Sequence, residues 1–207
     1  MIIKRISLTN YRNIETATID LHPRLTIFLG PNGVGKTNIL ESIHLLSFPR
    51  SFRTRKDELL KQWDKDFCRV EGSIDIDEAE HSLVFFHDKS KKLQMDGQTL
   101  NASMFVGQFL SVLFAPEDVD LLSSSPTRRR GFLDAHLALL SPQYFSHLLH
   151  YNKVIKQRNK LLSKPNISSI ELDFWNTQQI EHGTALIESR VKGIDAFNRV
   201  LFPELNI

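Results

Sequence analysis

Apolar residues along the first hundred positions mostly alternate with polar ones, a spacing typical of half-buried β-strands. The alternation extends over residues 6–21, apart from an interruption at YRN. Residues 25–29 (LTIFL) are apolar almost throughout, which favours a strand buried on both sides in a central sheet. Further alternating runs between residues 68 and 100 flank Asp96-Gly97, a dipeptide preferred in two-residue hairpin turns. These patterns predict a central sheet with an antiparallel meander attached to it.

A change of period to three or four residues marks the predicted helices. The first helix is predicted between residue 36 and Pro49, which fits its end. Its apolar face consists of Ile39, Ile43 and Leu46. Residues 109–114 (FLSVLF) return to the pattern of an apolar strand, and a helix is predicted to start after Pro116.

From residue 128 onward the chain is predicted to be mainly helical. Two long amphipathic helices flank the breaker KPNISS at residues 164–169. The expected core positions of the first, seven apart, are Leu148, Ile155 and Leu162. Those of the second are Ile170, Phe174, Ile187, Val191 and Ile194. Two helices joined by a short turn form an antiparallel hairpin, so we predict a short helical arm.

Composition excludes several classes of protein. The 207 residues are of ordinary globular composition, and the single cysteine, Cys68, excludes an intrachain disulfide and is expected to be buried. The N-terminus lacks the apolar run of a signal peptide, and no stretch approaches the about 18 apolar residues of a membrane-spanning helix. A soluble cytoplasmic protein is therefore expected. The net charge of +2 is too small to indicate a polyanionic partner, so the positions of the charges must decide.

The segment GPNGVGKT matches the P-loop pattern G-x-x-x-x-G-K-[ST] between a predicted buried strand and a predicted helix. Glycines let the backbone N–H groups converge on phosphate oxygens, and the helix N-terminus points its positive end at the same place. Lys36 is expected to reach the β and γ phosphates, and the Thr37 hydroxyl to hold Mg²⁺. The predicted nucleotide-binding residues of this segment are Gly30, Pro31, Asn32, Gly33, Val34, Gly35, Lys36, Thr37 and Asn38.

The loop alone does not choose among kinases, GTPases and ATPases. No Asn-Lys-x-Asp guanine reader is present, whereas Arg128–Arg130 (TRRRGF) could form the arginine-bearing lid of a small-molecule kinase. Hydrolysis also needs an acidic residue at the end of a second apolar strand, and Glu117 or Asp118 follows residues 109–114. The same residues suit a plain helix N-terminus, so both interpretations remain open at this point.

Five segments in this order carry a resemblance to a known family. They are LTNYRN, LTIFLGPNGVGKTNILESIHLLSFPRSFRT, LFAPEDVDLL, SPTRRRGFLD and YNKVIKQRNKLL. Together they resemble RecF, a family of bacterial DNA-repair ATPases related to SMC proteins and ABC-type ATPases. The P-loop is shared by many families, whereas its combination with SFRT, FAPED and TRRRGFLD is far more specific.

The resemblance implies an α/β fold: the P-loop NTPase lobe of an ABC-type ATPase head, with a mixed sheet and an antiparallel meander, followed by a helical subdomain with a short antiparallel arm. The predicted lobes are residues 1–107 and 108–207. The family's signature segment and Walker B strand are expected to be absent from this chain, which would then correspond to an N-terminal portion. It is therefore expected to bind ATP rather than hydrolyse it efficiently.

The function implied by the resemblance is ATP-dependent dimerisation and DNA binding in recombinational repair and replication-fork maintenance. Family partners would be DNA duplexes and gap junctions, a second copy of the chain, and RecR and RecO during recombinase loading at single-strand gaps. The expected location is the cytoplasm, in association with the nucleoid, and without a membrane. A P-loop small-molecule kinase and a non-catalytic DNA-binding module are the alternatives.

The resemblance also assigns roles to single residues. Arg12 and Asn13 would lie beside the bound nucleotide, and Arg12 could pair with phosphate as a planar donor. The end of residues 109–114 would correspond to the junction between lobes, where Glu117 either faces Mg²⁺ or caps a helix.

His147 and His150 lie one helical turn apart without further ligands, so they are interpreted as structural or solvated.

Two groups of basic residues, together with Arg128 and Arg129, are candidate DNA contacts. Four cations lie within seven positions after the P-loop helix, and no Asp or Glu occurs between Asp134 and Glu171. Such a one-sided charge distribution favours contact with a phosphate backbone. The candidate DNA-binding residues are Arg50, Arg53, Arg55, Lys56, Arg128, Arg129, Lys153, Lys156, Arg158 and Lys160.

Overall fold

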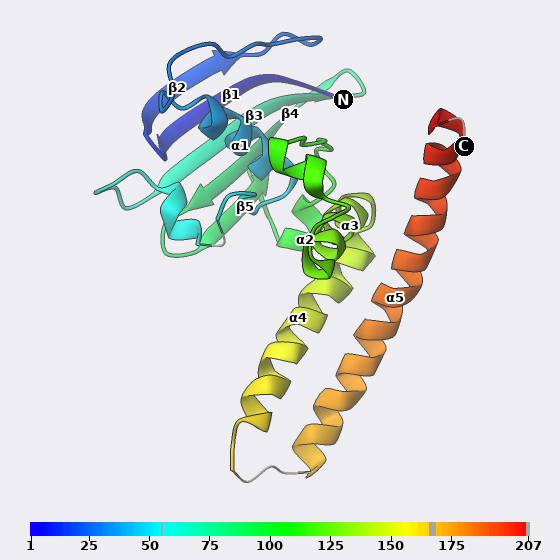
Figure 1. Cartoon of the computed structure of the whole chain (residues 1–207). Helices are drawn as coiled ribbons and strands as arrows, with labels where there is room; N and C mark the ends of the chain where they lie inside the picture. The colour runs from blue at the N-terminus through cyan, green and yellow to red at the C-terminus, as the bar shows by residue number, and fades with distance from the viewer. Residues whose placement is uncertain (55, 166–168, 206–207) are drawn as a thin grey trace. The chain divides into compact units, whose positions relative to one another are not determined.

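The computed structural model describes residues 1–54, 56–165 and 169–205, and it leaves out the side chains of residues 117, 202, 204 and 205 (Figure 1). By its internal contacts the chain divides into two compact units, Met1–Phe114 and Ala115–Ile207. We call them the N-terminal unit and the C-terminal unit. The boundary between residues 107 and 108, predicted from the sequence, stays a prediction.

The N-terminal unit is built on a six-stranded antiparallel sheet in the order β2-β1-β3-β4-β5-β6 (Figure 1). The strands are β1 Ile2–Tyr11, β2 Ile14–Asp20, β3 Cys68–Ile76, β4 Ala79–His87, β5 Lys91–Met95 and β6 Gln98–Leu100. The predicted turn at Asp96-Gly97 is confirmed: it joins β5 to β6, and both residues have positive φ, 50° and 78°. These values suit the type I′ turn, which matches the twist of the flanking strands.

One face of this sheet packs against α1, Lys36–Ser47, the helix that follows the P-loop. Gly72 on β3 makes room for the helix, because a Cβ there would lie 2.4 Å from a methyl carbon of Leu46. Short helices complete this unit: η1 Asp57–Leu60 and α2 Ala102–Phe105. The core residues are Ile6, Leu8, Tyr11, Leu45, Leu46, Leu60, Cys68, Val70, Ile74, Leu83, Phe85, Leu93, Phe105 and Phe109. The alternation predicted for the strands therefore places its apolar residues under α1.

The two segments predicted as buried apolar strands are not strands in the structure. Residues 25–29 and 109–114 belong to no described strand, and Leu29 and Val112 are 88% and 87% exposed. Among the described residues every strand pairing is antiparallel, so the sheet that the structure describes corresponds to the antiparallel part of the predicted one. The reason is physical: an apolar run becomes a buried strand only when neighbouring strands lie on either side of it.

The C-terminal unit is helical. It contains η2 Pro116–Asp120, α3 Pro126–Leu140, α4 Pro142–Leu162 and α5 Ser169–Leu205. Ser125 and Ser141 begin α3 and α4, since each side chain accepts a hydrogen bond from the third backbone N–H that follows it. The predicted helical hairpin is confirmed: α4 and α5 run antiparallel side by side (Figure 1). None of the described helices is both long and apolar enough to cross a membrane.

The residues that join α4 to α5 differ from the predicted ones. Ile187 and Val191 are 61% and 54% exposed, and Ile170, Phe174 and Ile194 are exposed as well, so the predicted stripe of α5 is wrong. On α4 the predicted Leu148 and Ile155 are half-buried. The fully buried apolar residues of the two helices are Tyr144, Phe145, Val154 and Leu161 on α4 and Leu186 on α5. Polar pairs join them, including Arg158 Nε donating to Asn176 Oδ1 at 2.9 Å. A pattern of apolar residues alone cannot detect a helical interface held partly by polar groups.

Three imidazoles meet between α4 and α5. His147 Nδ1 and His182 Nδ1 lie 3.0 Å apart, and the His150 ring stacks on His182 with centroids separated by 5.1 Å. Burial, together with His147 and His150, lowers the pKa of His182 below its usual value, although neighbouring Glu181 acts in the opposite direction. The described hairpin therefore favours the neutral form of His182 over the protonated one.

Acidification is expected to destabilise the C-terminal unit through His182. Because the pKa of His182 is lower in the folded state, the unfolded chain binds more protons once the pH falls below about 6.5. Stability should thus be fully present above this pH, decline as the pH falls, and level off below the folded pKa. Thermal unfolding followed by the helical circular-dichroism signal between pH 7.5 and 5 measures the effect.

The variant His182→Asn provides the comparison, because an amide of similar size cannot take up the proton. Its melting temperature should change less over the same pH range than that of the wild type. Equal slopes for the two proteins would show that His182 does not carry the acid sensitivity.

Candidate nucleotide-binding site

The P-loop, residues 30–37, leads directly into α1 as predicted. Gly33 and Gly35 have φ values of 84° and 115°, a region that side chains with a Cβ rarely adopt. The helix begins at Lys36, and its first turn contains no acidic residue. The first N–H groups of α1 and its positive end are therefore available to an anion.

The ammonium group of Lys36 lies against the backbone of this loop. Its Nζ donates to the carbonyl oxygens of Gly30 and Pro31 at 2.6 and 2.8 Å. An ammonium group held over the loop in this way is placed to receive phosphate oxygens in exchange for the two carbonyls. The neighbouring Thr37 is exposed. The donor set of the loop therefore fits a polyphosphate.

Two asparagines support the loop from outside. Asn13 Nδ2 donates to the Gly33 carbonyl at 3.0 Å, and Asn38 Nδ2 donates to Asn13 Oδ1 at 2.7 Å. A Cβ on Gly35 would approach Asn13 Oδ1 to 3.1 Å, so the turn between β1 and β2 packs closely on the loop. The structure thus brings Asn13 and Asn38 to the P-loop, where the sequence predicted them.

Arg12 is held by protein groups. Its Nε and Nη2 donate to the two oxygens of Glu41 at 2.9 and 2.6 Å, and its Nη1 donates to the Leu59 carbonyl at 2.8 Å. These contacts use three of the five guanidinium N–H groups, and the phosphate contact expected of Arg12 stays a prediction. What the geometry supports directly is an anchor between α1, the β1–β2 turn and η1.

Glu41 is the central residue that sequence reasoning missed. It is fully buried and also accepts hydrogen bonds from Tyr11 Oη at 2.8 Å and from Ser51 Oγ. Burial raises the pKa of the carboxyl, but the hydrogen bonds from Arg12, Ser51 and Tyr11 outweigh it and leave the pKa below its usual value. On the predicted helix Glu41 lies on the side opposite the apolar face of Ile39, Ile43 and Leu46, so the sequence pattern does not indicate its burial.

The basic loop after α1, residues 49–56, lies beside these groups. Arg50, Arg53 and Lys56 are exposed, and Arg53 Nη1 donates to Asn38 Oδ1 at 2.7 Å. Arg55, also a candidate, lies outside the described residues. A contact with DNA by this loop stays a prediction, but the structure adds that Arg53 is bonded to the residue that follows Thr37.

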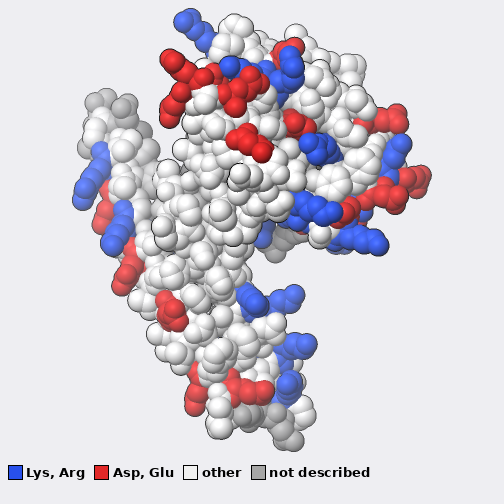
Figure 2. Space-filling model, turned by 180° about the vertical axis from the view of Figure 1, so that it is seen from behind, with Lys and Arg blue, Asp and Glu red and all other residues white. Residues whose placement is uncertain are grey.

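The second basic group forms one face of α4. Lys153, Lys156 and Lys160 are exposed and lie within about 60° of arc around the helix axis. Figure 2 shows basic side chains gathered along the α4 side of the hairpin. Arg158 is different, because it is half-buried and bonded to Asn176. We call Lys153, Lys156 and Lys160 the α4 basic face.

The remaining predicted residues lie in the first part of the C-terminal unit. Arg128 and Arg129 are exposed in the first turn of α3, and Arg128 Nη2 lies 3.9 Å from Asp118 Oδ1. Asp118 accepts a hydrogen bond from the Ala115 N–H at 2.9 Å, which supports the helix-start interpretation of this segment. The side chain of Glu117 lies outside the described part, so its metal role stays a prediction. Among the described residues no group of three or more His, Cys, Asp or Glu is arranged to hold a metal ion.

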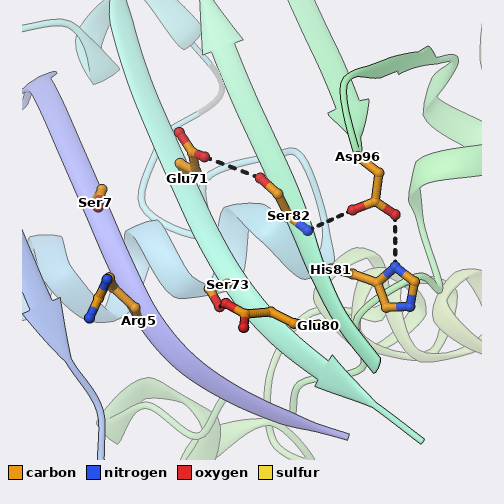
Figure 3. A pocket seen from close by; sticks show the side chains of 8 residues that line it. All are labelled: Arg5, Ser7, Glu71, Ser73, Glu80, His81, Ser82 and Asp96. Carbon is orange, nitrogen blue, oxygen red and sulfur yellow. Dashed lines mark hydrogen bonds and ion pairs between the residues drawn. The ribbon is translucent and has the colours of Figure 1, made fainter. Parts of the chain in front are cut away.

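A polar hollow elsewhere on the sheet is not part of this site (Figure 3). Its lining groups bond to one another: Asp96 accepts from the Ser82 N–H and pairs with His81 Nδ1 at 2.7 Å. Ser82 Oγ also donates to Glu71 at 3.1 Å. Because its polar groups satisfy one another, the hollow has the chemistry of a structural surface.

Comparison with known proteins identifies the family. A family model described as AAA ATPase domain matches residues 1–189. The chain belongs to the AAA ATPase domain family. This assignment agrees with the P-loop geometry described above and with the α/β fold predicted from the sequence.

The resemblance of this AAA ATPase domain to RecF is confirmed. The chain is 38% identical over 196 residues to the DNA replication and repair protein RecF of Oceanobacillus iheyensis, with 92% of this chain and 53% of that protein covered. It is 35% identical over 202 residues to RecF of Clostridium perfringens, with 96% and 56% covered. The chain thus spans about half the length of the curated relatives it matches.

Solved structures give the same result for the fold of the AAA ATPase domain. A structure described as the recombination mediator protein RecF-ATP in the RecFOR pathway matches with a TM-score of 0.86 and 31% identity, covering 94% of this chain and 54% of that one. A second RecF structure, described as RecF-ATPrS, matches with a TM-score of 0.87 and 32% identity, covering 93% and 54%. These matches confirm the predicted head-type fold with its helical part.

Proposed function

We propose that this chain binds ATP and Mg²⁺ at its P-loop and binds DNA in an ATP-dependent manner, as part of a RecF-like protein of recombinational repair. The observation that carries the proposal is Lys36, held over the Gly30 and Pro31 carbonyls at the start of a helix free of acidic residues in its first turn. Thr37 would hold the Mg²⁺ ion, which adds positive charge beside the phosphates. The RecF-ATP structure that matches this chain supports ATP as the nucleotide.

DNA is the proposed macromolecular partner because both units carry clustered, exposed basic residues. On α4 the three lysines of the α4 basic face share one side, and α4 contains no Asp or Glu. Phosphate contacts of this kind give affinity without sequence preference. The RecF relatives support further parts of the same proposal. These are ATP-dependent dimerisation, binding to duplex DNA and gap junctions, RecR and RecO as partners, and a nucleoid-associated place in the cytoplasm.

Removing the α4 basic face should weaken DNA binding and reduce its dependence on salt. The slope of log K for DNA binding against log salt is negative, and each phosphate contact contributes about −0.9 to it. We expect the triple variant Lys153→Ala, Lys156→Ala, Lys160→Ala to make this slope less negative by about 2.7. Titration of labelled duplex DNA at several salt concentrations, with ATP and Mg²⁺ present, measures the slope.

A matched triple variant, Lys65→Ala, Lys89→Ala, Lys92→Ala, removes the same charge from the N-terminal unit and should leave the slope nearly unchanged. Absence of DNA binding by the wild type even at low salt would contradict the proposed function. Transfer of phosphate from ATP to a small acceptor without DNA binding would instead support the kinase alternative.

A further inference from the structure

The Glu41 carboxylate joins segments of the N-terminal unit that are far apart in the sequence. On one side it pairs with Arg12 in the turn between β1 and β2. On the other side it accepts from Ser51 Oγ, and this hydroxyl accepts in turn from the backbone N–H groups of Arg53 and Thr54 at 2.9 and 3.0 Å. The backbone of the basic loop is therefore tied to the helix that begins in the P-loop.

A second set of bonds runs along the surface of the same helix. It starts at the Gly33 carbonyl, which accepts from Asn13, and continues to Asn38, which donates to Asn13 Oδ1. It ends at Arg53, whose Nη1 donates to Asn38 Oδ1. The two sets meet at Arg53, because Ser51 fixes its backbone while Asn38 fixes its guanidinium.

We propose that Glu41 and Ser51 are positioning residues that couple nucleotide binding at the P-loop to DNA binding at the basic loop. The inference rests on the proposed function, and it names the residues through which the two sites communicate. A polyphosphate would take Lys36 from the carbonyls of Gly30 and Pro31, in the same loop whose Gly33 carbonyl accepts from Asn13. The change reaches Arg53 only while the basic loop keeps its fixed position on α1.

Burial distinguishes this arrangement from an ordinary surface network. The Glu41 side chain is 0% exposed, and the Arg12 side chain is 15% exposed, whereas the Arg53 side chain is 46% exposed. The anchored end thus lies in the core and the charged end faces solvent, where a phosphate backbone can reach it. A rigid anchor with an exposed basic end lets two ligands bias the same element, which is the physical requirement for coupling.

Ser51→Ala is the informative variant because Ser51 itself touches neither proposed ligand. Without the hydroxyl, the Arg53 and Thr54 N–H groups lose their acceptor, and the basic loop is no longer fixed to Glu41. In the wild type we expect ATP and duplex DNA to lower each other's dissociation constant by about tenfold. In Ser51→Ala the change in either dissociation constant should be no more than about twofold. ATP affinity measured without DNA should stay at the wild-type value.

The measurement is a thermodynamic cycle on the full chain. Dissociation constants for ATP with Mg²⁺ are determined by calorimetry with and without saturating duplex DNA, and those for DNA with and without ATP, so that the two factors must agree. Ser51→Thr retains the hydroxyl and should restore the coupling. Ser47→Ala also removes a buried serine hydroxyl, at the end of α1 and outside this network, and should leave the coupling intact.

Each outcome bears on a different statement. Full coupling in Ser51→Ala, with the coupling also intact in Ser51→Thr, overturns the role of Ser51 and leaves the proposed function standing. The proposed function and this inference are overturned together if the wild type fails to bind ATP or fails to bind DNA. They are also overturned together if the wild type binds both ligands but neither changes the affinity for the other. Thermal unfolding of each variant, compared with the wild type, distinguishes loss of coupling from loss of fold.

Discussion

Replacing Lys36 by alanine is expected to weaken ATP binding by about 100-fold. The ammonium group supplies two charge-assisted hydrogen bonds within the loop, to Gly30 and Pro31, and the same donors would be offered to phosphate oxygens. A hydrogen bond to a charged group contributes about 1.5–3 kcal/mol. Because Lys36 gives up its carbonyl bonds when phosphate binds, the net loss is expected to be that of about one such bond, and about 1.4 kcal/mol corresponds to a factor of ten. Calorimetric titration of ATP with Mg²⁺ into the wild type and Lys36→Ala gives the two dissociation constants.

Lys89→Ala serves as the control, because Lys89 is exposed near the start of β5 and lies outside the P-loop and the basic loop. It removes the same charge and should keep the wild-type affinity. A Lys36→Ala protein that binds ATP as tightly as the wild type would refute the assignment of the P-loop as the nucleotide site. Loss of binding in both variants would indicate a dependence on net charge alone.

Replacing Glu41 by alanine should cost the N-terminal unit about 3–5 kcal/mol of unfolding free energy, the usual range when one partner of a buried ion pair is removed. The substitution leaves the Arg12 guanidinium without its counter-charge and removes the acceptor of the Tyr11 hydroxyl. Urea unfolding, with hydrogen exchange to assign the loss to residues 1–114, measures the effect.

Two comparisons make this result specific. Glu41→Gln retains an acceptor and the volume but lacks the charge, so its loss should be smaller than that of Glu41→Ala. Glu71→Ala removes a carboxylate that is 39% exposed and pairs with Arg69, so a change below about 1 kcal/mol is expected. If Glu41→Ala cost no more than Glu71→Ala, the buried carboxylate would not be an anchor of the fold.

The sequence allowed correct predictions where a feature depends on neighbouring residues. The Asp96-Gly97 turn is such a case, since its backbone conformation is set by those two residues and the strands beside them. The start of α1 at Lys36 is another, because the glycines before it and the apolar periodicity after it both lie within a short segment. Local chemistry is sufficient in both places.

Predictions failed where the result depends on distant residues. The apolar run at residues 25–29 was expected to be a buried strand, but the described residues provide it with no strand partner. The stripe through Ile187 and Val191 was expected to face α4, whereas Leu186 and His182 do so. Periodicity measures how apolar a face is, and it does not say which neighbour will cover that face.

The sequence placed Lys36 and Asn38 in and next to the P-loop, and the family resemblance placed Asn13 beside it. Their contacts with a nucleotide stay predictions. Glu41 could not be placed in this way, since its importance comes from meeting Arg12 and Ser51, which are brought together only by folding. A buried carboxylate with several donors follows no period in a sequence.

The exposed apolar side chains within residues 25–29 and 110–114 have a consequence for folding at high protein concentration. Leu29, Val112 and Phe114 are among the most exposed apolar side chains of the described residues, and both segments lie outside every strand. Apolar segments without strand partners can pair with the same segments of other molecules. Aggregation therefore competes with correct folding more strongly as concentration rises, and a chaperone that shields short apolar segments would raise the yield of folded chain.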